Sequence, residues 1–165
     1  MIKRKSISIW LILNDGKNKG KIILQRRSFR ERTFSYISQA TWSGKVEVHE
    51  NIKDAVKREC KEEMGREFFK SFNFSKLKII SKDKFIWEDK GETWIRYNYI
   101  GAIDSGLLKK IKFHDGAFSR PIIIGKNDTV YSIKSKKNPK NKVILFDDQY
   151  KILKKILNGA ERNTK

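Results

Sequence analysis

The 165-residue sequence contains one cysteine, two prolines and no long apolar segment. A lone cysteine, Cys60, cannot form an internal disulfide. No apolar run approaches the roughly 18 residues of a membrane-spanning helix. The basic start at residues 1–5 leads into a short apolar stretch that alternates with serine, which favours a strand over a signal peptide. We therefore expect a cytoplasmic protein with no membrane partner.

Acidic residues are also scarce. The chain has 19 Asp and Glu against 38 Lys and Arg, a formal net charge of +19. Such an excess attracts polyphosphates and steers RNA or DNA in a salt-dependent way. It also serves solubility alone, as in many proteins of high net charge. RNA is therefore one predicted partner, and a soluble basic surface without a nucleic-acid role is the alternative.

Against this background, three glutamates fall within residues 58–63. The segment has the apolar spacing of an amphipathic helix, with Asn51 as the N-cap and Gly65 just past the end. The apolar stripe of this helix consists of Ile52, Val56, Cys60 and Met64. A buried packing role is expected for the cysteine on this stripe.

The three glutamates, Glu59, Glu62 and Glu63, would share one face of that helix at spacings of three and four residues. Like charges repel at this spacing, and a hard divalent cation with oxygen ligands offsets such repulsion. Arg58 and Lys61 lie among the acids and could neutralise them on an ordinary solvated face instead.

The longer pattern favours the cation. Gly44, Glu50, Arg58-Glu59, Glu62-Glu63 and Gly65 have the spacing of the Nudix box, and the segment from residue 44 to 66 resembles that defining motif of the Nudix hydrolases. Four positions depart from the preferred pattern: Cys60 and Arg66 replace aliphatic residues without touching a metal ligand, and the other two stand where many members carry glycine. The four are Ser43, His49, Cys60 and Arg66.

The resemblance implies a metal site for Mg²⁺ or Mn²⁺. Glu59 and Glu63 would be the main ligands, with Glu62 as a further ligand or as the base that orients water. A backbone carbonyl at Gly44 can come close to the ion because glycine has no side chain. Magnesium commonly links such carboxylates to substrate phosphates.

The resemblance also implies catalytic roles for Glu62, Glu63, Arg58 and Glu50. Glu50 and Arg58 would pair and hold the loop against the helix. The reaction would be metal-dependent attack of water on phosphorus, which splits a nucleoside diphosphate from its linked group. The expected substrate is thus a nucleotide-type diphosphate: a nucleotide, nucleotide sugar, dinucleoside polyphosphate or RNA 5′ end.

Other contacts to substrate are less specific. Arg26, Arg27 or Arg30 could bind a phosphate, and Trp42 could stack on a base. The alternative for each aromatic is a place in the core. Further stacking candidates are Phe34, Tyr36 and Trp87. Candidates for a general base outside the motif are Glu88, Glu92 and Asp115, each of which could equally be an ordinary turn acid.

The remaining pattern predicts strands at residues 7–13 and 21–27, a hairpin from residues 84–87 and 93–100, and a C-terminal helix from Asp147. Periodicity alone supports only helices and strands packed in layers. The resemblance implies an α/β (α+β) Nudix fold, a mixed β-sheet sandwiched between α-helices. We expect one domain over residues 1–165, with a basic loop at 135–141 and a frayed tail at 161–165.

Three functions are compatible with the sequence. The first is a Nudix pyrophosphohydrolase, which the intact glutamates favour. The second is a catalytically silent Nudix domain that binds a nucleotide or RNA. The third is isopentenyl diphosphate isomerase, which residues 25–28 resemble, but the absence of cysteine from residues 36–45 argues against it. The family resemblance also allows a homodimer.

Overall fold

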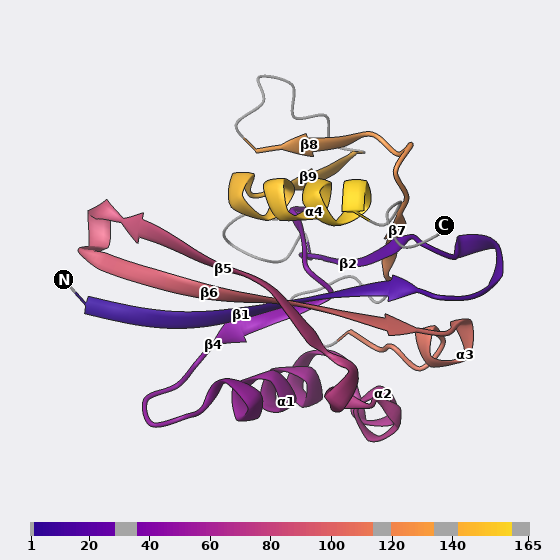
Figure 1. The fold of residues 1–165 in the computed structure, drawn as a ribbon, viewed down its shortest axis with the longest axis horizontal. Coiled ribbons are helices and arrows are strands. Elements are labelled where there is room, and N and C mark those ends of the chain that lie inside the picture. Colours follow the sequence, from indigo (N-terminus) through magenta and orange to yellow (C-terminus); the bar gives the residue numbers. More distant parts are fainter. Residues whose placement is uncertain (1, 29–35, 114–119, 134–141, 160–165) are drawn as a thin grey trace.

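The structure is a computed structural model that describes residues 2–28, 36–113, 120–133 and 142–159. A mixed, curled sheet forms the centre, in the strand order β5-β6-β1-β2-β3-β9-β8, with β4 beside β1 and β7 beside β2. Helices α1 (Ile52–Glu63) and α2 (Arg66–Ser71) cover one side of the sheet, and α4 (Asp147–Gly159) covers the other (Figure 1). This arrangement confirms the predicted mixed sheet between helices.

The longest strand pairing in the sheet is parallel and lies at its centre. Strand β1 (Ile2–Leu13) runs beside β6 (Glu92–Ile103), from Ile2 opposite Glu92 to Leu13 opposite Ile103. Strand β2 (Ile22–Arg26) pairs antiparallel with β1 through a turn that contains η1 (Gly16–Asn18). The predicted first strand pair is confirmed, although β1 begins five residues earlier than its alternation suggested.

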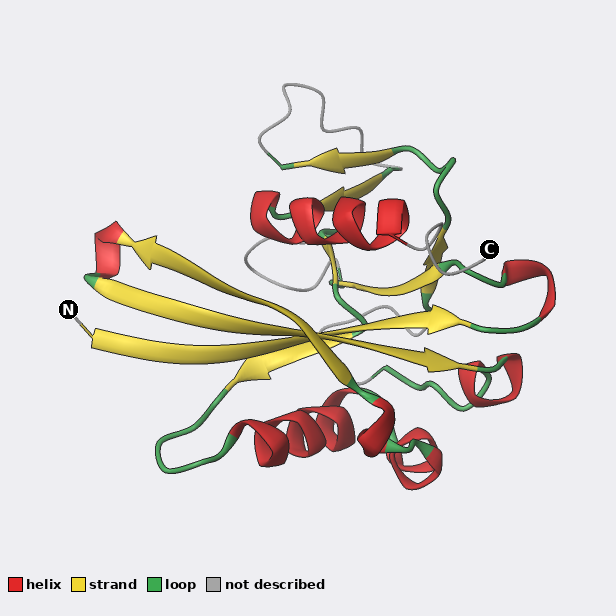
Figure 2. Cartoon of the chain, in the orientation of Figure 1, coloured by secondary structure: helices red, strands yellow, loops and turns green. Residues whose placement is uncertain are grey.

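The predicted hairpin is also present and is longer than expected. Strand β5 (Lys78–Trp87) pairs antiparallel with β6, and η3 (Glu88–Lys90) joins them. Gly91, with φ +60°, closes the turn. The free ends of β1, β5 and β6 project beyond the helices (Figure 2). We call this projection, residues 2–6, 83–87 and 92–96, the β-arm.

Short elements complete the fold. Strands β3 (Ser38–Gln39) and β4 (Trp42–Lys45) precede the motif helix, and η2 (Phe74–Lys76) and α3 (Ser105–Leu108) flank the hairpin. The last strands are β7 (Ile122–Ile124), β8 (Val130–Ser132) and β9 (Val143–Leu145).

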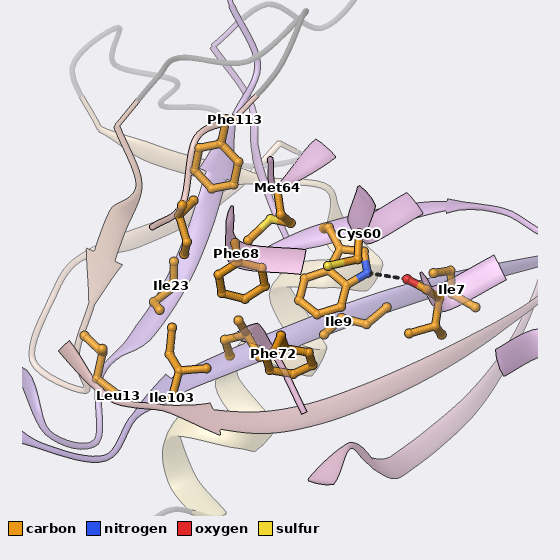
Figure 3. Packing of buried hydrophobic residues seen from close by; sticks show 14 residues of the cluster. Ile7, Ile9, Leu13, Ile23, Cys60, Met64, Phe68, Phe72, Ile103 and Phe113 are labelled. Carbon is orange, nitrogen blue, oxygen red and sulfur yellow. Dashed lines mark hydrogen bonds between the residues drawn. The ribbon is translucent and has the colours of Figure 1, made fainter. Parts of the chain in front are cut away.

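Two apolar cores hold the helices to the sheet. Under α1 and α2, Cys60, Met64, Phe68 and Phe72 pack on Ile9 and its neighbours (Figure 3). The second core lies under α4, where apolar residues of that helix are buried against the opposite face of the sheet. These residues include Leu153, Ile156 and Leu157, together with Trp10 and Leu24 of the sheet.

The ends of α1 follow from its sequence. The Asn51 side chain accepts the backbone N–H of Asp54, as an N-cap does. Gly65, with φ +86°, lets the chain turn directly into α2. Burial raises the pKa of the Cys60 thiol to about 12. The predicted helix, its cap and the packing role of Cys60 are therefore confirmed.

Several predictions lie outside the described residues: the basic loop at 135–141, the tail at 161–165, and the roles of Arg30, Phe34 and Asp115. Within the described ranges, no helix has the length and apolar character to cross a membrane.

Candidate active site

The motif begins on an edge strand and continues into the buried helix. Strand β4 pairs antiparallel with β1, which places Gly44 opposite Ile7 and Ser43 opposite Ser8. The loop to α1 is held by two hydrogen bonds between Glu47 and Glu50, one from each backbone N–H. Since α1 packs under β4, the glutamates of the helix are brought to the edge of that strand.

Arg58 joins the loop to the helix. Its Nε donates to Glu50 Oε1 at 2.9 Å, and Nη2 donates to Glu50 Oε2 at 3.1 Å and to the Lys45 carbonyl at 2.8 Å. Its Nη1 donates to Glu59 Oε1 at 2.8 Å and to Glu62 Oε2 at 3.2 Å. A two-bond contact of this kind fixes the orientation of both groups. The predicted pairing of Glu50 with Arg58 is therefore present.

These contacts keep both partners charged. The hydrogen bond from Arg58 holds the pKa of Glu50 below its ordinary value, and the bond to Glu50 raises the pKa of Arg58 despite partial burial. Arg58 thus remains a cation and Glu50 an anion across the physiological range.

Glu59 lies directly against Gly44. A Cβ added to Gly44 would lie 1.9 Å from Glu59 Cδ and 2.0 Å from Oε1. The Glu59 side chain is largely buried, and desolvation raises its pKa although Arg58 opposes the shift. Only glycine at position 44 allows the carboxylate to approach the strand this closely.

Glu63 is the most perturbed acid of the motif. Its Oε2 accepts the backbone N–H of Ser43 at 3.3 Å. Burial raises its pKa to about 8, an effect that the Ser43 hydrogen bond and Arg27 partly oppose. Glu62, by contrast, leaves 57% of its side chain exposed. The three carboxylates therefore differ in environment: Glu59 is buried against Gly44, Glu63 is largely desolvated beside Ser43, and Glu62 is exposed.

The donor set suits a hard cation: carboxylates of Glu59, Glu62 and Glu63 around the backbone of Gly44. In the arrangement described, however, Glu59 and Glu62 both turn toward Arg58. Throughout the described ranges no three His, Cys, Asp or Glu side chains are positioned to hold one ion. Cation binding would thus require these carboxylates to turn from Arg58 toward Glu63.

A cavity of about 620 Å³ opens beside the motif and continues along the β-arm. Motif residues at one end are Ser43 and Gly44, and aromatic rings of the arm form the other end. Another cavity, of about 480 Å³, lies between α1 and the turn at η2 and is lined by Lys53, Val56, Lys57, Phe74, Ser75, Leu77 and Tyr99. Neither cavity is lined by a motif glutamate. Only the first includes Ser43, whose N–H binds Glu63, and Gly44, against which Glu59 lies, so the first cavity is the one beside this site.

Comparison with known proteins decides the family. The model of the NUDIX domain matches residues 3–119, well over half of the chain. The chain belongs to the Nudix family. No curated protein sequence matches it. Membership of this family supports a Nudix hydrolase.

Solved structures show the same fold at low sequence identity. The MutT/nudix family protein of Enterococcus faecalis has a TM-score of 0.65 and 16% identity, covering 98% of this chain and 63% of that one. The MutT NUDIX hydrolase of Burkholderia pseudomallei has a TM-score of 0.59 and 17% identity, covering 93% of this chain and 97% of that one. The chain thus spans less than two thirds of the Enterococcus protein.

The C-terminal domain of mouse MUTYH, solved in complex with human PCNA, also shares the fold. Its TM-score is 0.54 at 10% identity, and the match covers 96% of this chain and 90% of that domain. The Nudix fold therefore occurs both in named hydrolases and in a domain described by its complex with another protein.

One predicted substrate contact of the Nudix site is wrong. Trp42 is fully buried, its Nε1 donates to the Val56 carbonyl at 3.2 Å, and its ring packs edge-on against Phe68 and Phe72. Alternation along β4 directs residues 42 and 44 to the same side of the sheet, toward α1. Trp42 therefore anchors the motif helix and presents no face to a base.

The arginines before the Nudix box separate into two roles. Arg26 donates to the carbonyls of Tyr36 and Lys142 at 3.2 and 3.3 Å, so it braces neighbouring backbone. Arg27 lines the cavity and lowers the pKa of Glu63. Of the two, only Arg27 lines the cavity beside the motif.

Among the aromatic candidates, Trp87 lines the cavity and is 42% exposed, with Lys90 Nζ 4.0 Å from its ring centre. Sequence reasoning missed several residues of this cavity because their strands looked like ordinary alternating strands. The missed residues are Arg4, Ser6, Ser8, Lys45, Phe85, Trp94 and Arg96.

The candidate bases in the hairpin lie too far from the box. Gly44 and Tyr97 both pair with Ile7, so they lie at the same level of the sheet. Glu92 is five residues from Tyr97 along β6, about 16 Å from that level. The Glu92 carboxylate accepts Trp94 Nε1 at 2.9 Å and Arg4 Nε at 3.1 Å. The Trp94 bond is the main cause of its lowered pKa. A general base must reach its proton directly or through one water, so Glu92, and Glu88 beyond it, do not fit.

Proposed function

We propose that the protein is a metal-dependent Nudix pyrophosphohydrolase that cleaves a nucleoside diphosphate derivative by attack of water at phosphorus. The observation that carries this proposal is the Arg58 junction. One guanidinium contacts the loop at Lys45 and Glu50 and the helix at Glu59 and Glu62. It supports the family function because it fixes the strand edge and the helix in the relative position that the reaction needs.

Glu59, Glu63 and the Gly44 carbonyl would hold Mg²⁺ or Mn²⁺, with Glu62 completing the set. The ion would supply charge stabilisation at the phosphoryl oxygens and a lower pKa for a bound water. Arg27, at the cavity wall beside Glu63, would bind a phosphate oxygen.

The three carboxylates divide the remaining work. Glu62 is exposed enough to orient an attacking water and accept its proton. Glu63, which the Ser43 N–H positions, holds a proton near neutrality without a cation and loses it when one binds. Arg58 and Glu50 act through position, since their charges are already satisfied by each other.

The test is hydrolysis of a nucleotide panel that includes nucleoside triphosphates, nucleotide sugars, dinucleoside polyphosphates and 5′-triphosphorylated RNA. We expect turnover of at least one member with Mg²⁺ or Mn²⁺, and a loss of roughly 100-fold or more in kcat for Glu63→Gln. Lys61→Gln, on the same helix but outside the motif carboxylates, is the matched control. Turnover unchanged by Glu63→Gln, or absent across the panel, removes the hydrolase proposal.

A silent binding domain is the second candidate. It is favoured by the orientation of Glu59 and Glu62 toward Arg58, with no three-ligand cluster in the described segments. Calorimetric titration with Mg²⁺ separates the two candidates, because a silent domain would bind nucleotide without binding the ion at Glu63. The isomerase has less support, since Cys60 is buried in the core and its thiol pKa is about 12.

A further inference from the structure

Two hydroxyls at the base of the large cavity lack a hydrogen-bond partner. Ser6 and Ser8, on the same face of β1, both line the cavity, and Ser8 is fully buried while Ser6 is 8% exposed. Neither Oγ has a partner among the described residues. A buried polar group in that state costs about 1–3 kcal/mol in general, so its presence calls for a ligand or a water.

The neighbours of these serines do not satisfy them. Ser8 lies opposite Asn98 on β6, but Asn98 is already bonded to Trp10, Ser81 and Asp83. Ser6 lies opposite Arg96 on one side and Lys45 on the other. Ser6 is thus flanked by two cations, and Ser8 by Asn98 and Ser43.

The positive charge of the cavity favours a ligand group that is negatively charged. One acid, Glu92, lines the cavity together with five cations. Two further acids act on Arg96: Asp148 through an ion pair and Asp83 from the opposite position on β5. The ion pair with Asp148 occupies Nη1 of a guanidinium that has five N–H donors. The cationic residues are Arg4, Arg27, Lys45, Lys90 and Arg96. Serine O–H groups among an excess of cations match the oxygens of a phosphate.

We propose that Ser6, Ser8 and Arg96 bind a phosphate group of the substrate that lies outside its 5′-polyphosphate chain. This inference rests on the proposed hydrolase function and narrows its substrate to nucleoside diphosphate derivatives that carry such a further phosphate. Neutral ribose or base edges would satisfy the hydroxyls equally, but they would gain nothing from the surrounding positive charge.

The position of Arg96 and the face on which the serines lie separate this phosphate from the scissile pair. Strand β1 lies between β4, which carries Gly44, and β6, which carries Arg96. Adjacent strands are about 4.8 Å apart, so Arg96 lies about two strands, or 10 Å, from the Gly44 edge. Gly44 faces α1 and Glu59, whereas the serines face the cavity. A substrate would therefore cross from the strand edge over β1 toward the β-arm.

Two sources could supply the additional phosphate. One is a mononucleotide with a phosphate on its ribose, and the other is the first phosphodiester of an oligonucleotide. The cavity continues to Trp87 and Lys90 at the tip of the β-arm. Stacking and cationic groups beyond the serines suit a longer chain, so the arm would add affinity for further nucleotides only in the second case.

The experiment compares kcat/KM for ATP, adenosine 3′-phosphate 5′-triphosphate, pppApG and pppApGpU at fixed ionic strength. We expect roughly a tenfold or larger gain for the substrates with a further phosphate, which one charged hydrogen-bond group can supply. A full gain with the 3′-phosphate identifies the mononucleotide source. A gain that continues with chain length identifies the oligonucleotide. Equal kcat/KM for all four overturns the proposal.

Ser6→Ala/Ser8→Ala tests the named residues. The double variant should lose most of the gain, roughly tenfold, while its unfolding free energy stays the same or rises because no unpaired hydroxyl remains. Ser38→Ala is the matched control, since Ser38 Oγ is likewise buried and without a partner but does not line the cavity. Ser38→Ala should leave the unfolding free energy the same or higher, as in the double variant, and should keep the gain in kcat/KM. A double variant that retains the gain shows hydroxyls satisfied by water alone and overturns the proposal.

A binding measurement separates this inference from the hydrolase proposal. Equilibrium binding of the same four nucleotides to the wild-type protein and to Ser6→Ala/Ser8→Ala needs no turnover. Tighter binding of the extended nucleotides that depends on the serines supports the phosphate site even if no substrate is hydrolysed. Hydrolysis of ATP with no serine-dependent preference, in turn, supports the hydrolase and overturns the site.

Discussion

The Glu59 carboxylate occupies the space in which a side chain at Gly44 would lie, with Glu59 Cδ 1.9 Å from the position of an added Cβ. Gly44→Ala should therefore displace Glu59, because the carboxylate end of a side chain moves more readily than the paired backbone of β4. We expect little change in fold by circular dichroism but a loss of cation affinity and turnover of roughly 10- to 100-fold.

Gly125→Ala is the control for Gly44→Ala. An added Cβ at Gly125 meets its nearest neighbour, Lys21 Cγ, at an ordinary 3.4 Å. It should leave both cation affinity and activity within twofold. Full activity of Gly44→Ala would show that Glu59 does not need its place against the strand.

Arg58→Lys should weaken the junction between the loop and the helix. Lysine keeps the charge but cannot make the paired contacts to both oxygens of Glu50. The side chain is 30% exposed, so we expect the unfolding free energy to fall by only about 1–3 kcal/mol. Activity should fall more than tenfold because Gly44 and Glu59 would no longer be held together.

A double-mutant cycle with Glu50→Gln measures the coupling of this pair by urea denaturation. The two single changes should be far from additive, since each removes the same contact. Additive effects would mean that Glu50 and Arg58 act independently, in conflict with their geometry.

Stability of the cation-free protein should fall as pH rises from 4.5 to about 8. Burial raises the pKa of Glu63 from its ordinary 4.5 to about 8, so in this range the folded state holds a proton that the unfolded state has lost. Folding is then favoured by low pH, and the favourable contribution disappears as pH passes the folded pKa. We expect a change on the order of 3 kcal/mol, measured by denaturation in EDTA at pH 5 and pH 8.5.

Glu63→Gln should flatten that dependence, because the amide does not ionise. Added Mg²⁺ should also flatten it, with release of about one proton per ion near pH 6.5. If the wild-type and Glu63→Gln curves have the same slope, Glu63 titrates normally and burial does not raise its pKa.

Trp42→Phe should reduce stability without changing substrate affinity. The indole is fully buried and donates to the Val56 carbonyl, so we expect a loss of about 1–3 kcal/mol in unfolding free energy. KM should stay within twofold for any substrate of the panel. Trp87→Phe, at a 42% exposed site, should change stability by less than about 0.5 kcal/mol. A large rise in KM with unchanged stability would restore Trp42 as a substrate contact.

Much of the motif region could be predicted because its signals are local. The four-residue spacing of Ile52, Val56 and Cys60 predicts the helix, and Asn51 and Gly65 mark its ends through capping chemistry. The spacing of the Nudix box likewise predicts the Glu50–Arg58 pair. The single domain, the homodimer, the choice of cation and the cytoplasmic location remain predictions.

The tertiary structure decided what depends on contacts between distant segments. Parallel pairing of β1 with β6 joins residues about 90 positions apart, and nothing in either strand's alternation specifies the partner. That pairing builds the β-arm and brings Arg96 beside Ser6. The side of the sheet that α1 covers also decides that Trp42 is core. The sequence by itself therefore determined the chemistry of the motif, while long-range strand pairing determined the cavity in which a substrate can meet it.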